Sequence, residues 1–192
     1  MSLQIFEQPT PNPYAMKYIL SEDVLSHGKM TFTDAAKCAH VPLAVSLLAI
    51  DSVSQVHFFE NVITVTRVES GSGEQIIMDT IRAGMDGHNP DINDQEEEER
   101  TQSRAGLSDD QQRIEAILDE KIRPALQMDG GDLDVVRYDP ENHRLLVAYQ
   151  GACGGCPSAS AGTLMAIQGI LRDDFDPDIE VIPDESGAVP YH

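Results

Sequence analysis

The sequence predicts an α/β (α+β) chain of two small domains, each a short sheet packed with two helices. Runs of β-branched and aromatic residues alternate with segments of helical apolar spacing in both halves. With 192 residues and 41% hydrophobic content, each half can bury only a modest core. An acidic segment with hardly any large apolar residue separates the halves at residues 86–106.

This acidic segment sets the expected domain boundaries. Residues 86–106 carry seven acidic and two basic side chains, and Ile92 is their one large aliphatic residue. Because like charges repel and no apolar face can be buried, we expect a flexible linker. The N-terminal domain would then span residues 1–85 and the C-terminal domain residues 107–192.

The N-terminal domain is expected to form a small sheet with two helices against one face. Pro42 is a favourable first residue for a helix. Two β-branched runs meet at Glu60 and Asn61, which predicts a hairpin. The expected elements are a strand at 14–20, a helix at 42–50, hairpin strands at 53–59 and 62–68, and a closing helix at about 76–83.

The C-terminal domain is expected to run helix, two strands, helix, strand. Ser108 precedes Gln111 by three residues, a pairing that caps a helix start. Pro124 should interrupt this helix, and Gly130 with Gly131 should end it. The later elements are hairpin strands at 133–138 and 145–149, a helix from residue 157 and a strand at 179–182.

Charge and hydropathy exclude several classes of partner. The formal net charge is −20, so contacts with nucleic acid or an anionic membrane surface are not expected. No stretch approaches the roughly 18 apolar residues that cross a bilayer. Neither a basic start with an apolar block nor an arginine-rich segment opens the sequence, so we expect a cytoplasmic location.

The segment between Gly151 and Pro157 is the one place where residue types and spacing suit a specific chemistry. Cys153 and Cys156 form a C-x-x-C pair that can direct two sulfurs at one metal centre. The glycines between them allow a tight loop. Pro157 should start a helix whose N-terminal partial charge favours the thiolate, the form that binds iron or zinc.

Two sulfurs are half of what such a centre needs, because zinc and iron–sulfur centres usually take four protein ligands. His143 lies ten residues upstream of Cys153, across the hairpin, so a mononuclear site completed by a histidine is an alternative; the other five histidines have no metal-ligand spacing. Cys38 lies in the other half and is predicted to be a packed thiol. Two chains that place their C-x-x-C pairs face to face would supply all four ligands.

The residues around the motif resemble a known family. The runs IRPALQMDGGDL at 122–133 and QGACGGCPS at 150–158 closely resemble the NifU-like C-terminal domain of iron–sulfur scaffold and carrier proteins. The run TPNPYAMKY at 10–18 is similar to the N-terminal domain that accompanies it in Nfu-type proteins.

This resemblance implies a 4Fe-4S cluster assembled between two subunits, with Cys153 and Cys156 of each subunit as ligands. The cluster would then pass to apo iron–sulfur client proteins. The resemblance also implies a homodimer in the cluster-bound form, upstream cluster-assembly proteins as further partners, and a carrier that is no enzyme and has no catalytic residue.

Two other functions also use a C-x-x-C pair. A thioredoxin-like thiol–disulfide oxidoreductase places it at a strand-to-helix junction, although here no aromatic residue directly precedes Cys153 and the longer element order of that fold is missing. A zinc-binding interaction module would use it as a structural staple. Metal content separates the zinc module from the cluster carrier.

Overall fold

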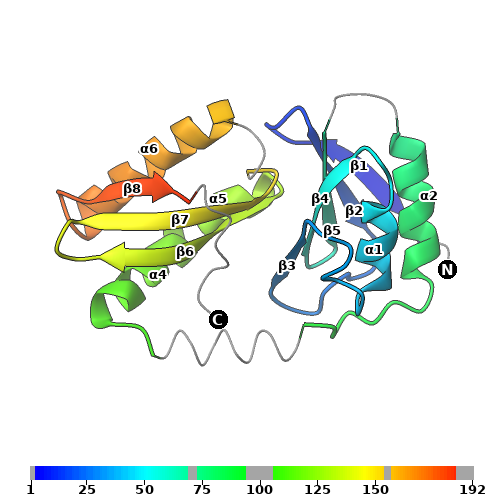
Figure 1. Cartoon of the computed structure of the whole chain (residues 1–192), viewed down its shortest axis with the longest axis horizontal. Coiled ribbons are helices and arrows are strands. Elements are labelled where there is room, and N and C mark those ends of the chain that lie inside the picture. The colour runs from blue at the N-terminus through cyan, green and yellow to red at the C-terminus, as the bar shows by residue number, and fades with distance from the viewer. Residues whose placement is uncertain (1–2, 69–72, 94–105, 154–156, 185–192) are drawn as a thin grey trace. The chain divides into compact units, whose positions relative to one another are not determined.

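The computed structural model describes residues 3–68, 73–93, 106–153 and 157–184, without the side chains of residues 157–161. The chain divides into two compact units, Met1–Gln95 and Glu96–His192 (Figure 1). Both combine a sheet with helices, which confirms the predicted fold class. Within the described ranges, no helix has the length and apolar character needed to cross a membrane.

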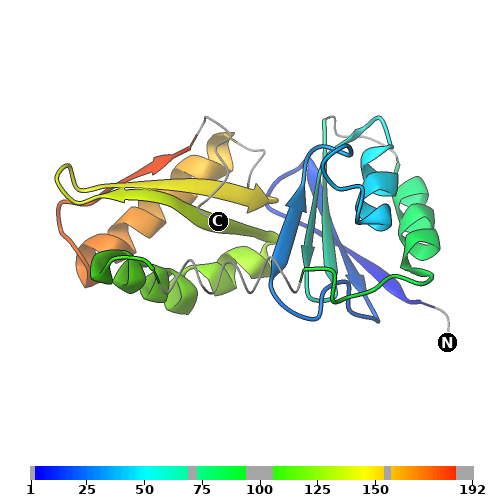
Figure 2. The same ribbon diagram turned by 60° about the horizontal axis from the view of Figure 1, so that its bottom comes forward.

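The first unit is a five-stranded antiparallel sheet in the order β1-β2-β5-β4-β3. Two helices cover one of its faces, as expected; Figure 2 shows both on the same side of the sheet. The elements are β1 (Ile5–Pro9), β2 (Ala15–Leu20), β3 (Lys29–Phe32), α1 (Pro42–Leu48), β4 (Val53–Phe59), β5 (Val62–Arg67) and α2 (Glu74–Met85).

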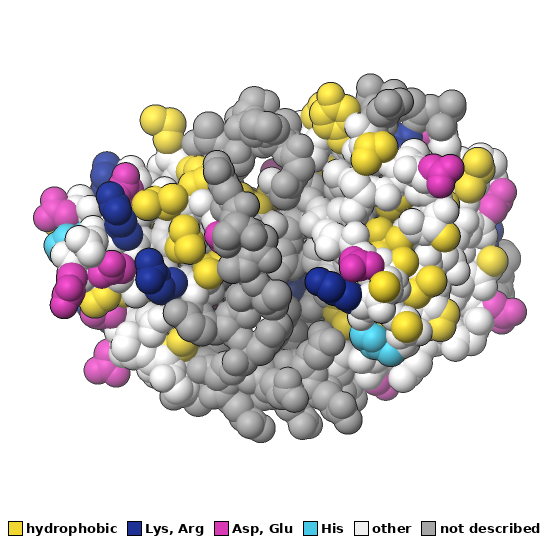
Figure 3. Space-filling model, in the orientation of Figure 1, with side chains coloured by type: hydrophobic (Ala, Val, Ile, Leu, Met, Phe, Trp, Pro, Cys, Tyr) yellow, Lys and Arg dark blue, Asp and Glu magenta, His cyan; other side chains and the backbone are white. Residues whose placement is uncertain are grey.

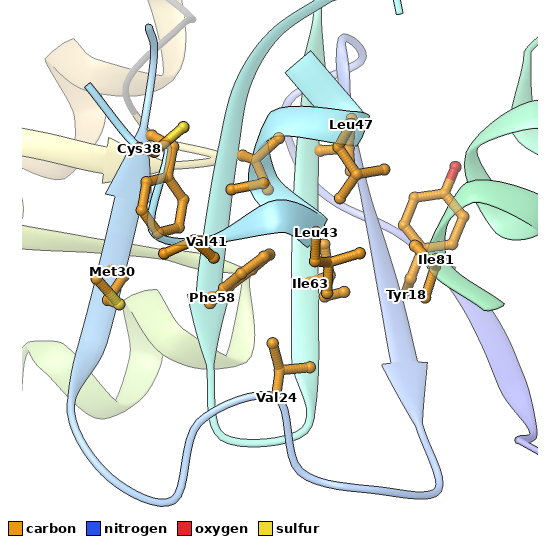
Figure 4. Packing of buried hydrophobic residues seen from close by; sticks show 14 of the residues in the cluster. Tyr18, Val24, Met30, Cys38, Val41, Leu43, Leu47, Phe58, Ile63 and Ile81 are labelled. Carbon is orange, nitrogen blue, oxygen red and sulfur yellow. The ribbon is translucent and has the colours of Figure 1, made fainter. Parts of the chain in front are cut away.

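The core of the first unit lies between the sheet and these helices. Alternate strand residues such as Tyr18 and Ile63 are fully buried, and they form one cluster with Leu43 and Leu47 of α1 (Figure 4). Period-two alternation in the strands and helical spacing in α1 therefore converge on one apolar layer, as binary patterning requires.

Two strands of this sheet, β1 and β3, are absent from the sequence-based prediction. Both are edge strands, which are commonly short and carry polar residues or proline. β1 reads IFEQP and ends in Pro9, and β3 has only four residues, Lys29–Phe32. Neither strand is long enough to show a clear alternation of apolar and polar residues. Both are strands because of their pairing with β2 and β4, and their own sequences do not predict them.

Residues just after α2 are part of the first unit. Asn93 donates from Nδ2 to the carbonyl of His27 at 2.7 Å and is almost fully buried. Nε2 of His88 lies 2.8 Å from the carbonyl oxygen of Val24. The expected linker starts at Asp86, but these contacts support a later start. We propose that it begins after Asn93; residues 94–105 lie outside the described part.

The second unit is a three-stranded sheet in the order β6-β7-β8, with β6 and β7 antiparallel and β7 and β8 parallel. The parallel pair needs a crossover, which α6 supplies. Its elements are α4 (Asp109–Lys121), α5 (Arg123–Met128), β6 (Gly131–Asp139), β7 (Arg144–Gly151), α6 (Pro157–Asp174) and β8 (Glu180–Pro183).

Local sequence signals fix the helical start of this unit. Ser108 accepts from the amide of Gln111, whose side chain accepts from the amide of Ser108, so the predicted capping box is confirmed. Pro124 lies at the start of α5, and the helix breaks at Ile122, between α4 and α5. The break follows from the missing amide donor and the bulk of the proline ring.

Strand β6 contains a bulge between Val135 and Arg137. Before the bulge, Leu133 is opposite Tyr149, and after it Tyr138 is opposite Leu145. All four side chains belong to the core cluster of this unit. The bulge therefore changes the phase of the strand and keeps both halves of it facing the helices.

Candidate metal-binding site

The cysteine loop begins where β7 ends, next to the glycine pair Gly130 and Gly131 at the start of β6. Gly131 is opposite Gly151 in the last pair of the ladder. The amide of Ala152 then donates to the carbonyl of Gly130 at 3.0 Å. Gly130 and Gly151 have φ values of 80° and 61°, a conformation that side-chain-bearing residues rarely adopt. Gly130 leads into β6, and Gly151 lies two residues before Cys153.

The sulfur of Cys153 lies over Gly131. A Cβ placed on Gly131 would be 2.5 Å from Sγ of Cys153, 2.9 Å from the carbonyl oxygen of Gln150 and 3.0 Å from the amide nitrogen of Cys153. Two of these neighbours are backbone atoms, which cannot rotate away. Gly131 is therefore the residue whose missing side chain makes room for the sulfur.

The protonation state of Cys153 differs from the one expected. Burial raises the pKa of the Cys153 thiol to about 11, with further contributions from the negative charges of Asp129 and Asp132. This shift is opposite in direction to the one predicted from the helix N-terminus, because burial and two carboxylates raise the pKa. A metal that binds here must displace a proton.

The second predicted ligand, Cys156, lies outside the described residues. Pro157, directly after it, is the first residue of α6, as the sequence predicts. Among the residues that the structure describes, no group of three or more histidine, cysteine and acidic side chains is arranged to hold a metal ion. Cys153 is thus the one predicted ligand whose surroundings the structure shows.

His143 and Cys38, the other residues considered as ligands, are occupied elsewhere. His143 is in the turn before β7, while Cys153 follows its far end, roughly 25 Å along the strand. Nδ1 of His143 lies 2.6 Å from Oδ2 of Asp176. Cys38 is buried in the core of the first unit (Figure 4). Its Sγ lies 3.7 Å from the carbonyl oxygen of Ala35.

A buried arginine forms ion pairs with three carboxylates, one of which belongs to Asp132, near the cysteine loop. Arg123 pairs with Glu115 at 2.8 Å, with Asp119, and with Asp132 at 3.6 Å. Its Nε also donates to the carbonyl of Leu133 at 3.4 Å. Burial opposes the charge of Arg123, but the three carboxylates outweigh this effect and raise its pKa.

The sequence-based reading missed this cluster, although Glu115, Asp119 and Arg123 follow one another at helical spacing of four residues. For this region it predicted only that Gly130 and Gly131 end the helix. Elsewhere on the face shown in Figure 3, acidic side chains are spread over both units, in keeping with the net charge of −20.

Comparisons with known proteins match both units. Residues 5–88 match the family described as scaffold protein Nfu/NifU N terminal, and residues 114–182 match the NifU-like domain. The chain is 31% identical to NifU-like protein 4, mitochondrial, of Arabidopsis thaliana, over 85% of this chain and 60% of that protein. It is also 31% identical to the NFU1 iron-sulfur cluster scaffold homolog, mitochondrial, of Drosophila virilis, over 94% and 61%.

The chain therefore spans about three fifths of the length of these relatives. A Staphylococcus aureus protein of known crystal structure matches 43% of this chain and 99% of its own length, at 22% identity and a TM-score of 0.33. The names of the relatives contradict the expected cytoplasmic location, because they describe mitochondrial proteins.

Proposed function

We propose a function from one premise: this chain belongs to the Nfu-type iron–sulfur cluster scaffold proteins, whose two domains match residues 5–88 and 114–182. In this role it assembles a 4Fe-4S cluster between two subunits and transfers it to apo iron–sulfur client proteins. Cys153 and Cys156 of each subunit are the ligands. The cluster is the cargo, and the chain performs no catalytic conversion.

The observation that carries this proposal is the incomplete site at the end of β7. Cys153 is half-buried over Gly131, and Cys156 follows three residues later, directly before α6. No nearby histidine or carboxylate group of the described residues completes a metal site around Cys153. Two sulfurs per chain favour a cluster shared by two chains, because four ligands are needed.

A shared, loop-held cluster also suits transfer. The ligands lie after the last ladder pair of the hairpin rather than within it, so a client can approach the loop without opening the sheet. Incoming client thiolates would replace the cysteines one at a time, by the same kind of ligand exchange that metal–thiolate sites use. Upstream assembly proteins would deliver iron and sulfide to the same loop.

Anaerobic reconstitution with iron and sulfide tests this proposal. The wild-type protein should form a brown dimer with about four irons per two chains. Cys153→Ala and Cys156→Ala should each abolish the cluster and the dimer, while Cys38→Ser should leave both intact, because Cys38 is in the core of the other unit. A colourless monomer after wild-type reconstitution would contradict the proposal, as would a cluster retained by Cys153→Ala.

The two alternatives predict different measurements. A thiol–disulfide oxidoreductase needs a cysteine of lowered pKa, whereas burial raises the pKa of Cys153. That alternative would be supported only by rapid insulin reduction. A zinc-binding interaction module predicts one zinc and little iron in protein purified without oxygen, with unfolding on chelation. The iron-to-zinc ratio distinguishes the module from the scaffold.

A further inference from the structure

We infer that the hydroxyl of Tyr149 donates a hydrogen bond to the sulfur of Cys153 when that sulfur is bound to the cluster. Tyr149 would then be a positioning residue that steadies one cluster ligand. This inference rests on the proposed function, since it concerns the cluster-bound form of the site.

Strand geometry places Tyr149 and Cys153 on the same face of the sheet. Tyr149 is opposite Leu133, and Gly151 is opposite Gly131, two residues further along the ladder. Side chains two apart on a strand share a face. The sulfur of Cys153 lies where a Gly131 side chain would begin. The Cys153 sulfur is therefore the next group after the Tyr149 side chain along that face, at a spacing that an aromatic side chain can reach.

Both side chains pack against the core cluster of the second unit, which is otherwise formed mostly by aliphatic residues. The hydroxyl oxygen of Tyr149 is fully buried and has no hydrogen-bond partner among the residues that the structure describes. A buried hydroxyl without a partner is costly, and natural proteins usually provide one. In the apo form, this donor is therefore left available beside the metal-ligating loop.

The chemistry of sulfur explains why the bond would form only with the cluster. A neutral thiol is a weak acceptor, whereas a metal-bound thiolate carries negative charge and accepts a stronger, charge-assisted bond. Burial, and then the negative charge that Cys153 carries as a thiolate, raise the pKa of Tyr149, so its hydroxyl keeps the proton that it would donate. Ligation would thus supply the acceptor that the buried hydroxyl lacks.

Hydrogen bonds to ligating sulfur are one of the ways in which proteins adjust iron–sulfur centres. The bond proposed for Tyr149 would keep the Cys153 sulfur oriented and slow its exchange. Cluster retention would then be set partly by a side chain that is itself no ligand. Substitution of this tyrosine should therefore change how fast the cluster leaves, without changing how many irons are bound.

The experiment compares reconstituted wild-type protein with Tyr149→Phe and Tyr138→Phe. Phenylalanine keeps the ring and removes only the hydroxyl. Tyr138 is the matched control, because it belongs to the same core cluster but lies near the hairpin turn. Its ring centroid there is 5.6 Å from that of Phe175. Urea unfolding of the apo forms checks that each variant is folded.

Two readouts report on the bond itself. Resonance Raman spectra should show Fe–S(Cys) stretching bands that shift in D₂O for wild type and Tyr138→Phe but not for Tyr149→Phe. Iron release to a chelator should be about fivefold faster for Tyr149→Phe, the effect expected for one net hydrogen bond.

Equal D₂O shifts and equal release rates in all three proteins would overturn the inference while leaving the proposed function intact. If wild type assembles no cluster at all, the proposed function fails, and the inference fails with it. If Tyr138→Phe changes the bands as much as Tyr149→Phe does, the effect belongs to the fold and the inference is wrong.

Discussion

The sulfur of Cys153 occupies the space that a side chain on Gly131 would need, because a Cβ on Gly131 would lie 2.5 Å from that sulfur. The two residues are separated by most of the hairpin in sequence, and the pairing of Gly131 with Gly151 brings them together. The location of the ligand therefore depends on a residue without any chemistry of its own.

The first prediction concerns Gly131→Ala. The new methyl group would meet the sulfur and two backbone atoms of the cysteine loop, so the loop must move. We expect a loss of about 1–3 kcal/mol in the free energy of unfolding and a lower yield of cluster on reconstitution. Urea unfolding and iron content measure these effects.

Gly162→Ala is the matched control for Gly131→Ala. Gly162 lies within α6 and a Cβ there would meet nothing within 4 Å, so alanine should stabilise the helix by about 0.5–1 kcal/mol. Normal cluster yield in Gly131→Ala would show that the close approach does not govern the ligand.

The second prediction concerns Arg123→Met. Arg123 is almost fully buried, and its removal leaves Glu115 and Asp132 without their cationic partner. Breaking such a buried network typically costs about 3–5 kcal/mol, measured as a change in the urea midpoint at constant slope. Arg144→Met is the control: its ion pair with Glu180 is exposed, so the change should stay within about 0.5 kcal/mol. Similar losses in both variants would contradict this account.

The third prediction concerns alkylation of Cys153 in the apoprotein. With its pKa raised to about 11, Cys153 should react with iodoacetamide at pH 8 roughly a hundredfold slower than an unperturbed thiol. Fragment-ion mass spectrometry distinguishes Cys153 from Cys156, which lies on the same tryptic peptide, and the peptide mass distinguishes it from Cys38. Asp129→Asn removes a negative charge and should shift the rate profile to lower pH. A profile unchanged by this substitution would rule out Asp129 as a cause.

The fourth prediction concerns His143 and Asp176. A hydrogen bond to Asp176, and then its charge, raises the pKa of His143; the same contact lowers the pKa of Asp176. The pair should therefore stabilise the fold between these two pKa values. Stability should be lost as pH rises through the raised pKa of His143, and as pH falls through the lowered pKa of Asp176.

NMR titration of the His143 ring measures this effect, together with urea midpoints on either side of its pKa. Asp176→Asn should return the pKa of His143 toward its ordinary value and flatten the upper part of the stability profile. Asp79→Asn, which removes a carboxylate paired with Arg82 in the other unit, should leave the His143 titration unchanged. A raised His143 pKa that survives Asp176→Asn would contradict the assignment.

Local chemistry explains which parts of the fold could be predicted. The pairing of Ser108 with Gln111 and the effect of Pro124 act within a few residues, so the start and the interruption of the helix follow from sequence alone. The edge strands β1 and β3 depend on hydrogen bonds to distant strands. Their own residues carry too little alternation to predict them.

The candidate metal-binding site likewise has features that the sequence predicts and features that depend on tertiary structure. The spacing of Cys153 and Cys156 is a local signal, and it predicts the ligand pair. The role of Gly131 depends on strand register, and that of Tyr149 depends on burial of its hydroxyl. The direction of the Cys153 pKa shift also depends on tertiary structure, because desolvation comes from packing that the sequence does not show.

The extra residue in β6 has a consequence for how this hairpin can vary. Seven positions separate Gly131 from Tyr138, an odd interval that would send them to opposite sides of a regular strand; the irregularity near Val136 lets both face inward. The alternation of inward and outward side chains is therefore shifted by one residue between the two ends of β6. Deletion of Val136 would leave six positions between Gly131 and Tyr138 and a regular strand, in which Tyr138 would still lie opposite Leu145 and the glycine end would keep its pairing. The extra residue therefore adds a local bend to the hairpin without changing which side chains face the helices.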